Sequence, residues 1–76
     1  MTKVVLPELG EGIEKATVSY WYFKVGEKVS EKDDLVELVT DKATFNLPSP
    51  ATGVVSQIFY HEGDLVSVGE VVAIIE

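Results

Sequence analysis

The sequence predicts an all-β domain made of two similar sheets, and three observations support this fold class. Apolar residues recur with a period near two, in short runs rich in Val, Ile, Thr and aromatic residues. Clusters of Gly, Asp, Pro or Ser separate these runs. The third observation is an internal repeat. With 76 residues, the chain can hold one compact core but no deep substrate cleft.

Six to eight short strands are expected along the chain, because turn-forming residues bound each apolar run. Residues 30–38 come closest to a helix, but they lack the apolar spacing of an amphipathic helix and are interpreted as a turn followed by a strand. In chain order, the apolar runs cover residues 4–9, 17–25, 34–39, 43–47, 53–62 and 70–76.

The repeat aligns residues 16–39 with residues 53–76 at a constant offset of 37. Five identities in these 24 positions exceed the roughly one or two expected from ordinary composition. A Leu-Pro pair, Leu6-Pro7 or Leu47-Pro48, precedes each copy, but the first copy has four extra residues within segment 8–16, interpreted as a surface loop. The identical pairs are Val18 and Val55, Ser19 and Ser56, Gly26 and Gly63, Val29 and Val66, and Ser30 and Ser67.

Two copies of one unit imply two sheets related by an approximate two-fold axis, each too small to bury its apolar face alone. The segment Thr40–Ala43, with the sequence TDKA, links the copies. The two-fold axis would relate this segment to the place where the chain begins and ends. Lys42 is therefore expected at one pole of the domain, with both termini at the other.

Composition excludes several classes of function. Thirteen acidic residues against six lysines give a net charge of -7, which has the wrong sign for attracting nucleic acid or an anionic membrane surface. No cysteine is present, so disulfides and thiol chemistry are excluded. His61 is the only histidine, and we expect no metal site. We expect a soluble acidic domain, because the chain has no apolar run of membrane-spanning length.

Several motifs resemble the lipoyl domain of the E2 acyltransferases in 2-oxo acid dehydrogenase complexes. These motifs are LPELGEGI near the start, TDKA at the central turn, LPSPATGVV after it, and the paired turns VGEKV and EGDLV. Together they cover essentially the whole chain. In that family, lipoic acid is attached to the ε-amine of the lysine in the Asp-Lys-Ala turn. By position this lysine is Lys42, and its flanks Asp41 and Ala43 would be recognised by the modifying enzyme.

The resemblance implies a flattened β-barrel of two four-stranded antiparallel sheets. It further implies one lipoyl-type carrier domain over residues 1–76, excised from a longer E2 chain and without catalytic activity of its own. The expected location is the bacterial cytoplasm, or the mitochondrial matrix in a eukaryote, and the isolated domain would be a monomer.

The resemblance also implies lipoic acid as the cofactor and a set of partner enzymes. The partners would be the E1 2-oxo acid decarboxylase, the E2 catalytic core, the E3 dihydrolipoyl dehydrogenase, and a lipoate ligase or lipoyl transferase. In the family, the loop before the second strand lies beside the lipoyl-lysine and helps partners to discriminate between lipoyl domains. Expected contacts with E1 are therefore Leu9, Gly10, Glu11, Gly12, Ile13, Glu14 and Val39. At the position of Val39 the family often has an acidic residue.

Two alternative functions remain open at this point. A biotin carrier domain of a carboxylase shares the fold, but it typically has methionine on both sides of the modified lysine, where this chain has Asp41 and Ala43. An unmodified β-barrel module for protein contacts is the other alternative. In that case Lys42 would be only a charge that keeps a hairpin tip soluble.

Overall fold

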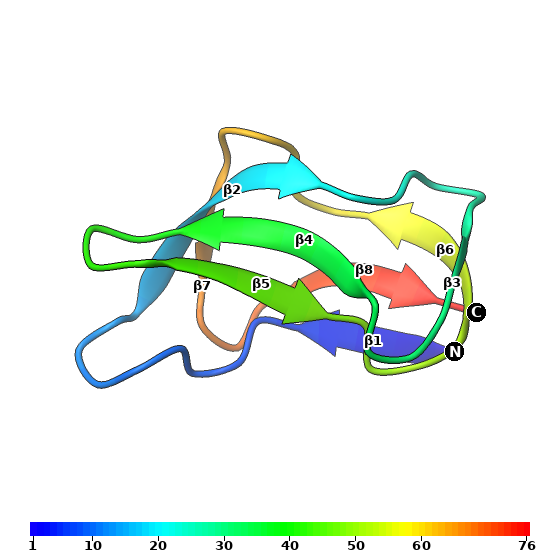
Figure 1. Ribbon diagram of the computed structural model, residues 1–76, viewed down its shortest axis with the longest axis horizontal. Helices are drawn as coiled ribbons and strands as arrows, with labels where there is room; N and C mark the ends of the chain where they lie inside the picture. Colours follow the sequence, from blue (N-terminus) through cyan, green and yellow to red (C-terminus); the bar gives the residue numbers. More distant parts are fainter.

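The computed structural model describes all 76 residues and contains eight strands in two four-stranded sheets (Figure 1). All neighbouring strands are antiparallel, as the resemblance implies. No helix in the structure is long and apolar enough to cross a membrane. The strands are β1 (Thr2–Val5), β2 (Lys15–Trp21), β3 (Lys28–Val29), β4 (Asp34–Val39), β5 (Thr44–Pro48), β6 (Gly53–Ile58), β7 (Leu65–Ser67) and β8 (Val71–Ile75).

The predicted two-fold relation between the halves is confirmed by the order of the strands. One sheet has the order β1-β8-β6-β3, and the other has the order β5-β4-β2-β7. Each strand of one sheet therefore has a counterpart at the same place in the other. Even an irregularity repeats, because the register shifts between Val18 and Tyr20 in β2 and between Val55 and Gln57 in β6. Both shifts lie at the serines that are identical in the two copies.

Each sheet takes strands from both halves of the chain. Strand β3 belongs to the first copy of the repeat but pairs with β6 of the second copy. Strand β7 of the second copy pairs with β2 of the first, and the N-terminal β1 pairs with the C-terminal β8. Neither half can therefore complete a sheet by itself.

The expected alignment of the two Leu-Pro pairs is wrong. The N–H of Leu6 donates to the Glu70 carbonyl at 2.9 Å, and the Leu6 carbonyl accepts from the Gly69 N–H at 2.8 Å. In the other half, Ser49 makes the same two bonds with Asp33 and Lys32, each at 2.8 Å. Leu6 is therefore equivalent to Ser49, two residues beyond Leu47. A shift of two residues keeps every side chain on its face of the sheet, so the alternation of apolar residues could not reveal the error.

The corrected alignment changes the size of the inserted loop. Pro7 is now equivalent to Pro50, and Ala16 remains equivalent to Gly53. The first copy therefore has six extra residues rather than four, and they are taken as residues 9–14.

The core lies between the two sheets, where their inner faces meet. Its buried side chains are almost all aliphatic, and Ser49 is the one buried polar residue. The Ser49 hydroxyl donates to the Ala51 carbonyl at 2.7 Å, so its burial leaves no unpaired polar group. The core cluster consists of Val4, Leu6, Ala16, Val18, Val29, Leu35, Val36, Leu38, Leu47, Val55, Val66, Val72, Ala73 and Ile75.

Four tight turns, at residues 24–27, 30–33, 61–64 and 67–70, share one construction. In each turn, the N–H of the fourth residue donates to the carbonyl of the first residue. The carboxylate of the fourth residue accepts from the N–H of the first in return. The third residue has a left-handed backbone, with φ between +76° and +96°, and it is Gly26, Lys32, Gly63 or Gly69.

The turn at residues 67–70 shows how strongly such a carboxylate is held. The Ser67 N–H and the Tyr60 hydroxyl both donate to the Glu70 carboxylate, each at 2.9 Å. The backbone bond from Ser67 and then the bond from Tyr60 lower the pKa of Glu70. Hydrogen bonds that favour the charged form are the physical cause.

Substitution by alanine should affect stability differently at Gly69 and at Lys32, although the two residues occupy equivalent left-handed positions. Gly69→Ala should destabilise the domain by about 1 kcal/mol, because a Cβ is unfavourable in a left-handed backbone. Nothing lies within 4 Å of the added Cβ, so the loss would come from the backbone alone. Lys32→Ala, at the equivalent position, should change stability by less than about 0.5 kcal/mol, because a Cβ is already present there. Urea unfolding of both variants measures the difference, and equal losses would contradict this explanation.

Candidate functional site

The hairpin between β4 and β5 carries Lys42 at its tip. Strand β4 ends at Val39, β5 begins at Thr44, and Lys42 is exposed between them. Figure 1 shows this hairpin at one end of the longest axis of the molecule, with both chain termini at the opposite end. The expected position of Lys42 relative to the termini is therefore confirmed. A group attached here would project away from the chain ends.

The turn that holds Lys42 is closed by the side chain of Thr40. The Thr40 N–H and the Thr40 hydroxyl both donate to the Ala43 carbonyl, at 2.8 and 2.9 Å. The same hydroxyl accepts from the N–H groups of Lys42 and Ala43, at 3.2 and 3.0 Å. Neither Asp41 nor Lys42 has a positive φ. The turn is therefore not one of the mirror-image types that close most two-residue hairpins, and a side-chain hydroxyl completes it instead.

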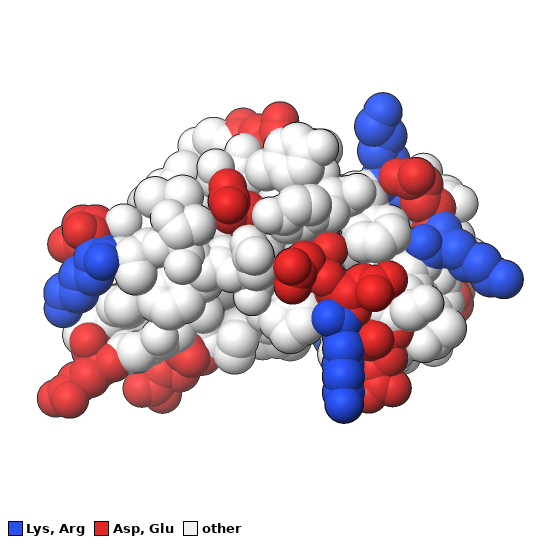
Figure 2. Space-filling view, in the orientation of Figure 1, with Lys and Arg blue, Asp and Glu red and all other residues white.

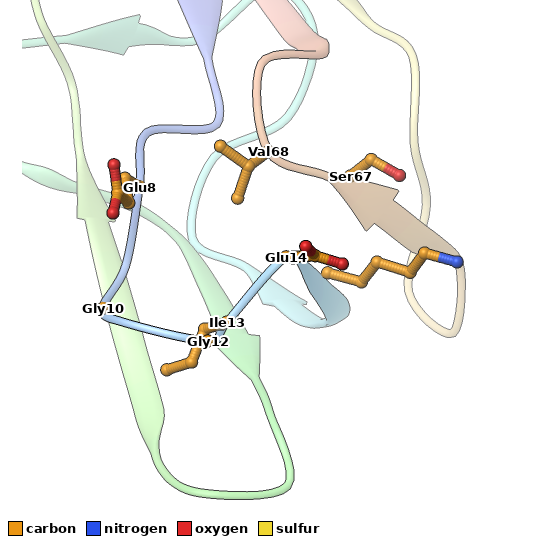
Figure 3. Close-up of a pocket in the computed structure, with 8 residues that line it drawn as sticks. Glu8, Gly10, Gly12, Ile13, Glu14, Ser67 and Val68 are labelled. Atoms are coloured by element: carbon orange, nitrogen blue, oxygen red, sulfur yellow. The ribbon is translucent and has the colours of Figure 1, made fainter.

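The inserted loop lies against the Lys42 side chain, as the sequence predicts. Gly12 has a φ of +78°, and a Cβ placed on it would lie 3.3 Å from the Lys42 Nζ. The loop is anchored by the Val68 N–H, which donates to the Glu14 carbonyl at 2.9 Å. Figure 3 shows the loop backbone passing beside the β4–β5 hairpin near its tip. The lysine amine therefore rests close to the backbone at Gly12.

A hollow of about 480 Å³ lies on the other side of this loop (Figure 3). The loop from Glu8 to Lys15 forms one wall, and Ser67 and Val68 at the end of β7 form the other. Only Ile13 and Val68 are apolar among the lining residues. The lining therefore mixes the acidic side chains of Glu8 and Glu14 with basic and apolar ones, and the hollow is unlike the enclosed apolar pockets that hold most small-molecule ligands.

The residues predicted to contact E1 fall into two groups. Four of them are exposed around the tip and are available to a partner: Glu11, Gly12, Glu14 and Val39. The other three, Leu9, Gly10 and Ile13, are only partly exposed, and Leu9 packs against the core. Asp41 and Ala43 are both exposed beside Lys42. Six of the seven predicted contacts are also the six residues taken as lacking a counterpart in the other half of the chain.

Exposed acidic side chains are present at this end of the domain, as they are on other parts of its surface. Glu8, Glu11, Glu14 and Asp41 are all exposed on the loop and the hairpin. Figure 2 shows acidic side chains around a projecting basic side chain at the end of the molecule where the hairpin lies. A protein that docks here with a basic surface would be attracted over a distance comparable to the Debye length.

Thr40 is the site residue that the sequence-based prediction missed. A signal for it was present, because Ser and Thr side chains often bond to backbone groups two or three residues further along a turn. The prediction concentrated on Asp41 and Ala43, which flank the lysine directly. In the structure, the side chain that shapes the turn comes from the residue before them.

Comparisons with known proteins decide the family. The profile of the family described as "Biotin-requiring enzyme", the biotin/lipoyl attachment domain, matches residues 2–75. The chain belongs to this family. A solved structure of the lipoyl domain of the 2-oxoglutarate dehydrogenase complex from Azotobacter vinelandii has the same fold, with a TM-score of 0.80 and 32% identity. That comparison covers 100% of this chain and 96% of the other.

Full-length relatives of this attachment domain are acyltransferase components. The chain is 43% identical over 75 residues to the succinyltransferase component of the 2-oxoglutarate dehydrogenase complex from Bartonella vinsonii. It is 44% identical over 68 residues to the acetyltransferase component of the pyruvate dehydrogenase complex from Acholeplasma laidlawii. These comparisons cover 99% and 90% of this chain but only 18% and 12% of the relatives.

The fold also occurs in a carboxylase. The urea carboxylase of Kluyveromyces lactis contains a region with a TM-score of 0.82 that covers 99% of this chain and 6% of that chain. The identity is only 20%, so this likeness concerns the fold alone.

Proposed function

We propose that this chain is the lipoyl carrier domain of an E2 acyltransferase and that Lys42 is the residue that carries lipoate. The observation that supports this most directly is an exposed lysine at the tip of a Thr-Asp-Lys-Ala hairpin, at the end of the domain opposite both termini. The domain itself catalyses no step. It carries acyl groups and reducing equivalents between E1, the E2 core and E3.

The site fits a covalently attached lipoyl group. An amide bond to Nζ needs an amine that a modifying enzyme can reach, and Lys42 is exposed on a turn that projects from the sheet. When bound, the lipoyl group supplies the dithiol and disulfide chemistry of acyl transfer. The residues of this chain supply position: the hairpin holds the attachment point, and the Gly12 backbone lies against the start of the arm.

Recognition by partner enzymes is assigned to the inserted loop and the hairpin together. The pseudo-symmetric connection in the second half joins its strands without residues like 9–14, so closing the barrel does not require them. Residues that the fold does not need, and that lie beside the reactive amine, are well placed to distinguish one partner from another. The exposed carboxylates of Glu11 and Glu14 favour a basic surface on E1.

Biotin attachment is the alternative, because the family includes both kinds of carrier. Asp41 and Ala43 favour lipoate, since the biotin carriers that resemble this chain typically have methionine at both positions. Intact mass after incubation with a lipoate ligase or a biotin ligase separates the two functions. No mass addition with either ligase would favour an unmodified interaction module.

Substitution of Lys42 tests the attachment site. Lys42→Arg should abolish lipoate incorporation, because the guanidinium is not an acceptor, and the unfolding free energy should change by less than about 0.5 kcal/mol at this exposed tip. Lys32→Arg is the matched control, since Lys32 occupies the same place in another four-residue turn. Intact mass and peptide mapping measure the result. Lipoate on another lysine of the Lys42→Arg variant would disprove the assignment.

Substitution of the flanks tests the choice of ligase. Asp41→Met combined with Ala43→Met should lower lipoylation and raise biotinylation, because two ligases that act on nearly identical hairpins must rely on local features. Both positions are exposed, so the fold should tolerate the change. Parallel incubations with the two ligases measure it, and unchanged modification by both enzymes would place discrimination elsewhere.

Removal of the loop tests partner recognition. Deleting residues 9–14 should leave lipoylation in place and lower reductive acylation by the cognate E1 at least tenfold, since the loop borders the reacting arm. Some stability would be lost, because Leu9 packs against the core. A full-length variant with Glu11→Ala and Glu14→Ala keeps that packing and should lose part of the E1 rate, most clearly at low salt. If E1 acylates both variants at the parent rate, the loop is only a connector.

A further inference from the structure

The Thr40 hydroxyl makes all of its hydrogen bonds within the turn that carries Lys42. A threonine hydroxyl offers one donor and two acceptor lone pairs. The donor goes to the Ala43 carbonyl at 2.9 Å, and the lone pairs accept from Lys42 N–H at 3.2 Å and from Ala43 N–H at 3.0 Å. No backbone carbonyl accepts from either N–H. The backbone N–H of the lysine is therefore held by one side chain alone.

Four other tight turns, at residues 24–27, 30–33, 61–64 and 67–70, are held differently. Each of the four has a carboxylate at its fourth position and a left-handed residue at its third. The turn at residues 30–33 is the most informative, because its third residue is also an exposed lysine, Lys32, with a φ of +76°. Lys42 occupies the third position of its own turn without a positive φ, and Ala43 at the fourth position has no carboxylate.

Lys32 and Lys42 are thus both exposed and both third in a tight turn, but the two turns are stabilised in different ways. The direction of a side chain follows from the φ of its residue, so the two turns aim their lysines differently relative to the flanking backbone. The Lys42 turn lacks the carboxylate and the left-handed residue that stabilise the 30–33 turn. The Thr40 hydroxyl is the one side-chain group that closes it. The small Ala43 side chain leaves the tip uncovered.

We propose that Thr40 is a positioning residue for the modification of Lys42, and that its hydroxyl fixes the turn shape by which the modifying enzyme distinguishes Lys42 from Lys32. This inference rests on the proposed function, since it assumes that Lys42 is the acceptor. Thr40 itself is only partly exposed, and its hydroxyl is engaged within the turn. It acts through the Lys42 backbone rather than by touching the reacting amine.

The test compares lipoylation of three variants and the parent domain. Thr40→Val removes the hydroxyl while keeping the β-branched shape, and Thr40→Ser restores the hydroxyl. Thr52→Val is the matched control, because the Thr52 hydroxyl also accepts a backbone N–H, from Glu31 at 2.9 Å, in the connection between β5 and β6. Initial rates of lipoate incorporation at several domain concentrations give kcat and KM for each, and circular dichroism checks folding.

We expect Thr40→Val to lower kcat/KM at least about tenfold, because small displacements of a reacting group have large effects on rate. Thr40→Ser and Thr52→Val should stay within about twofold of the parent. Parent rates for Thr40→Val would overturn the inference. So would loss of rate in Thr40→Ser as large as in Thr40→Val, because the hydroxyl would then not be the cause.

A second measurement does not depend on lipoylation. Amide hydrogen exchange at Lys42 and Ala43 should be faster in Thr40→Val and in Thr40→Ala than in the parent, and close to the parent in Thr40→Ser. Unchanged exchange in both hydroxyl-free variants would overturn the inference even if Thr40→Val failed to fold well enough for kinetics. Failure of the proposed function looks different, because in the parent domain itself lipoate would then be found on a lysine other than Lys42 or on no lysine at all.

Discussion

The exchange of strands between the two halves of the chain is the constraint on which the rest of the structure depends. Each sheet has one apolar face and must bury it, and the only surface that fits is the matching face of the other sheet. Because β3 and β7 cross into the opposite sheets and β1 pairs with β8, both sheets form only when the whole chain is in place. The core is therefore a single unit, although the sequence is a repeat.

This constraint determines where a functional group can be presented. The link between the two halves has no symmetry mate within the chain, since its counterpart is the gap between the termini. A hairpin at that link can change its sequence without disturbing a repeated contact. The Lys42 turn departs from the construction shared by the turns at residues 24–27, 30–33, 61–64 and 67–70, which come in two symmetric pairs.

The second departure from symmetry lies at the same end of the molecule. The inserted residues 9–14 follow the edge strand β1, and the connection brings Gly12 against the Lys42 amine. The two features that the fold does not require thus border each other. Both the loop and the hairpin carry exposed acidic side chains. The symmetric barrel supports this asymmetric end, where the proposed attachment site and the proposed recognition loop lie side by side.

The sequence by itself determined the fold class, the two-fold relation and the place of Lys42. The period-two alternation, the turn residues and the repeat offset of 37 can all be read directly from the sequence. The sequence could not determine the register of β1, because a shift of two residues leaves every side chain on the same face and preserves the apolar pattern. The loop beside Lys42 was predicted through resemblance. Only the tertiary structure decided that Gly12 is the residue beside the amine and that Thr40 closes the turn. Such contacts depend on where a loop backbone and a hydroxyl point in space, which residue type and spacing do not specify.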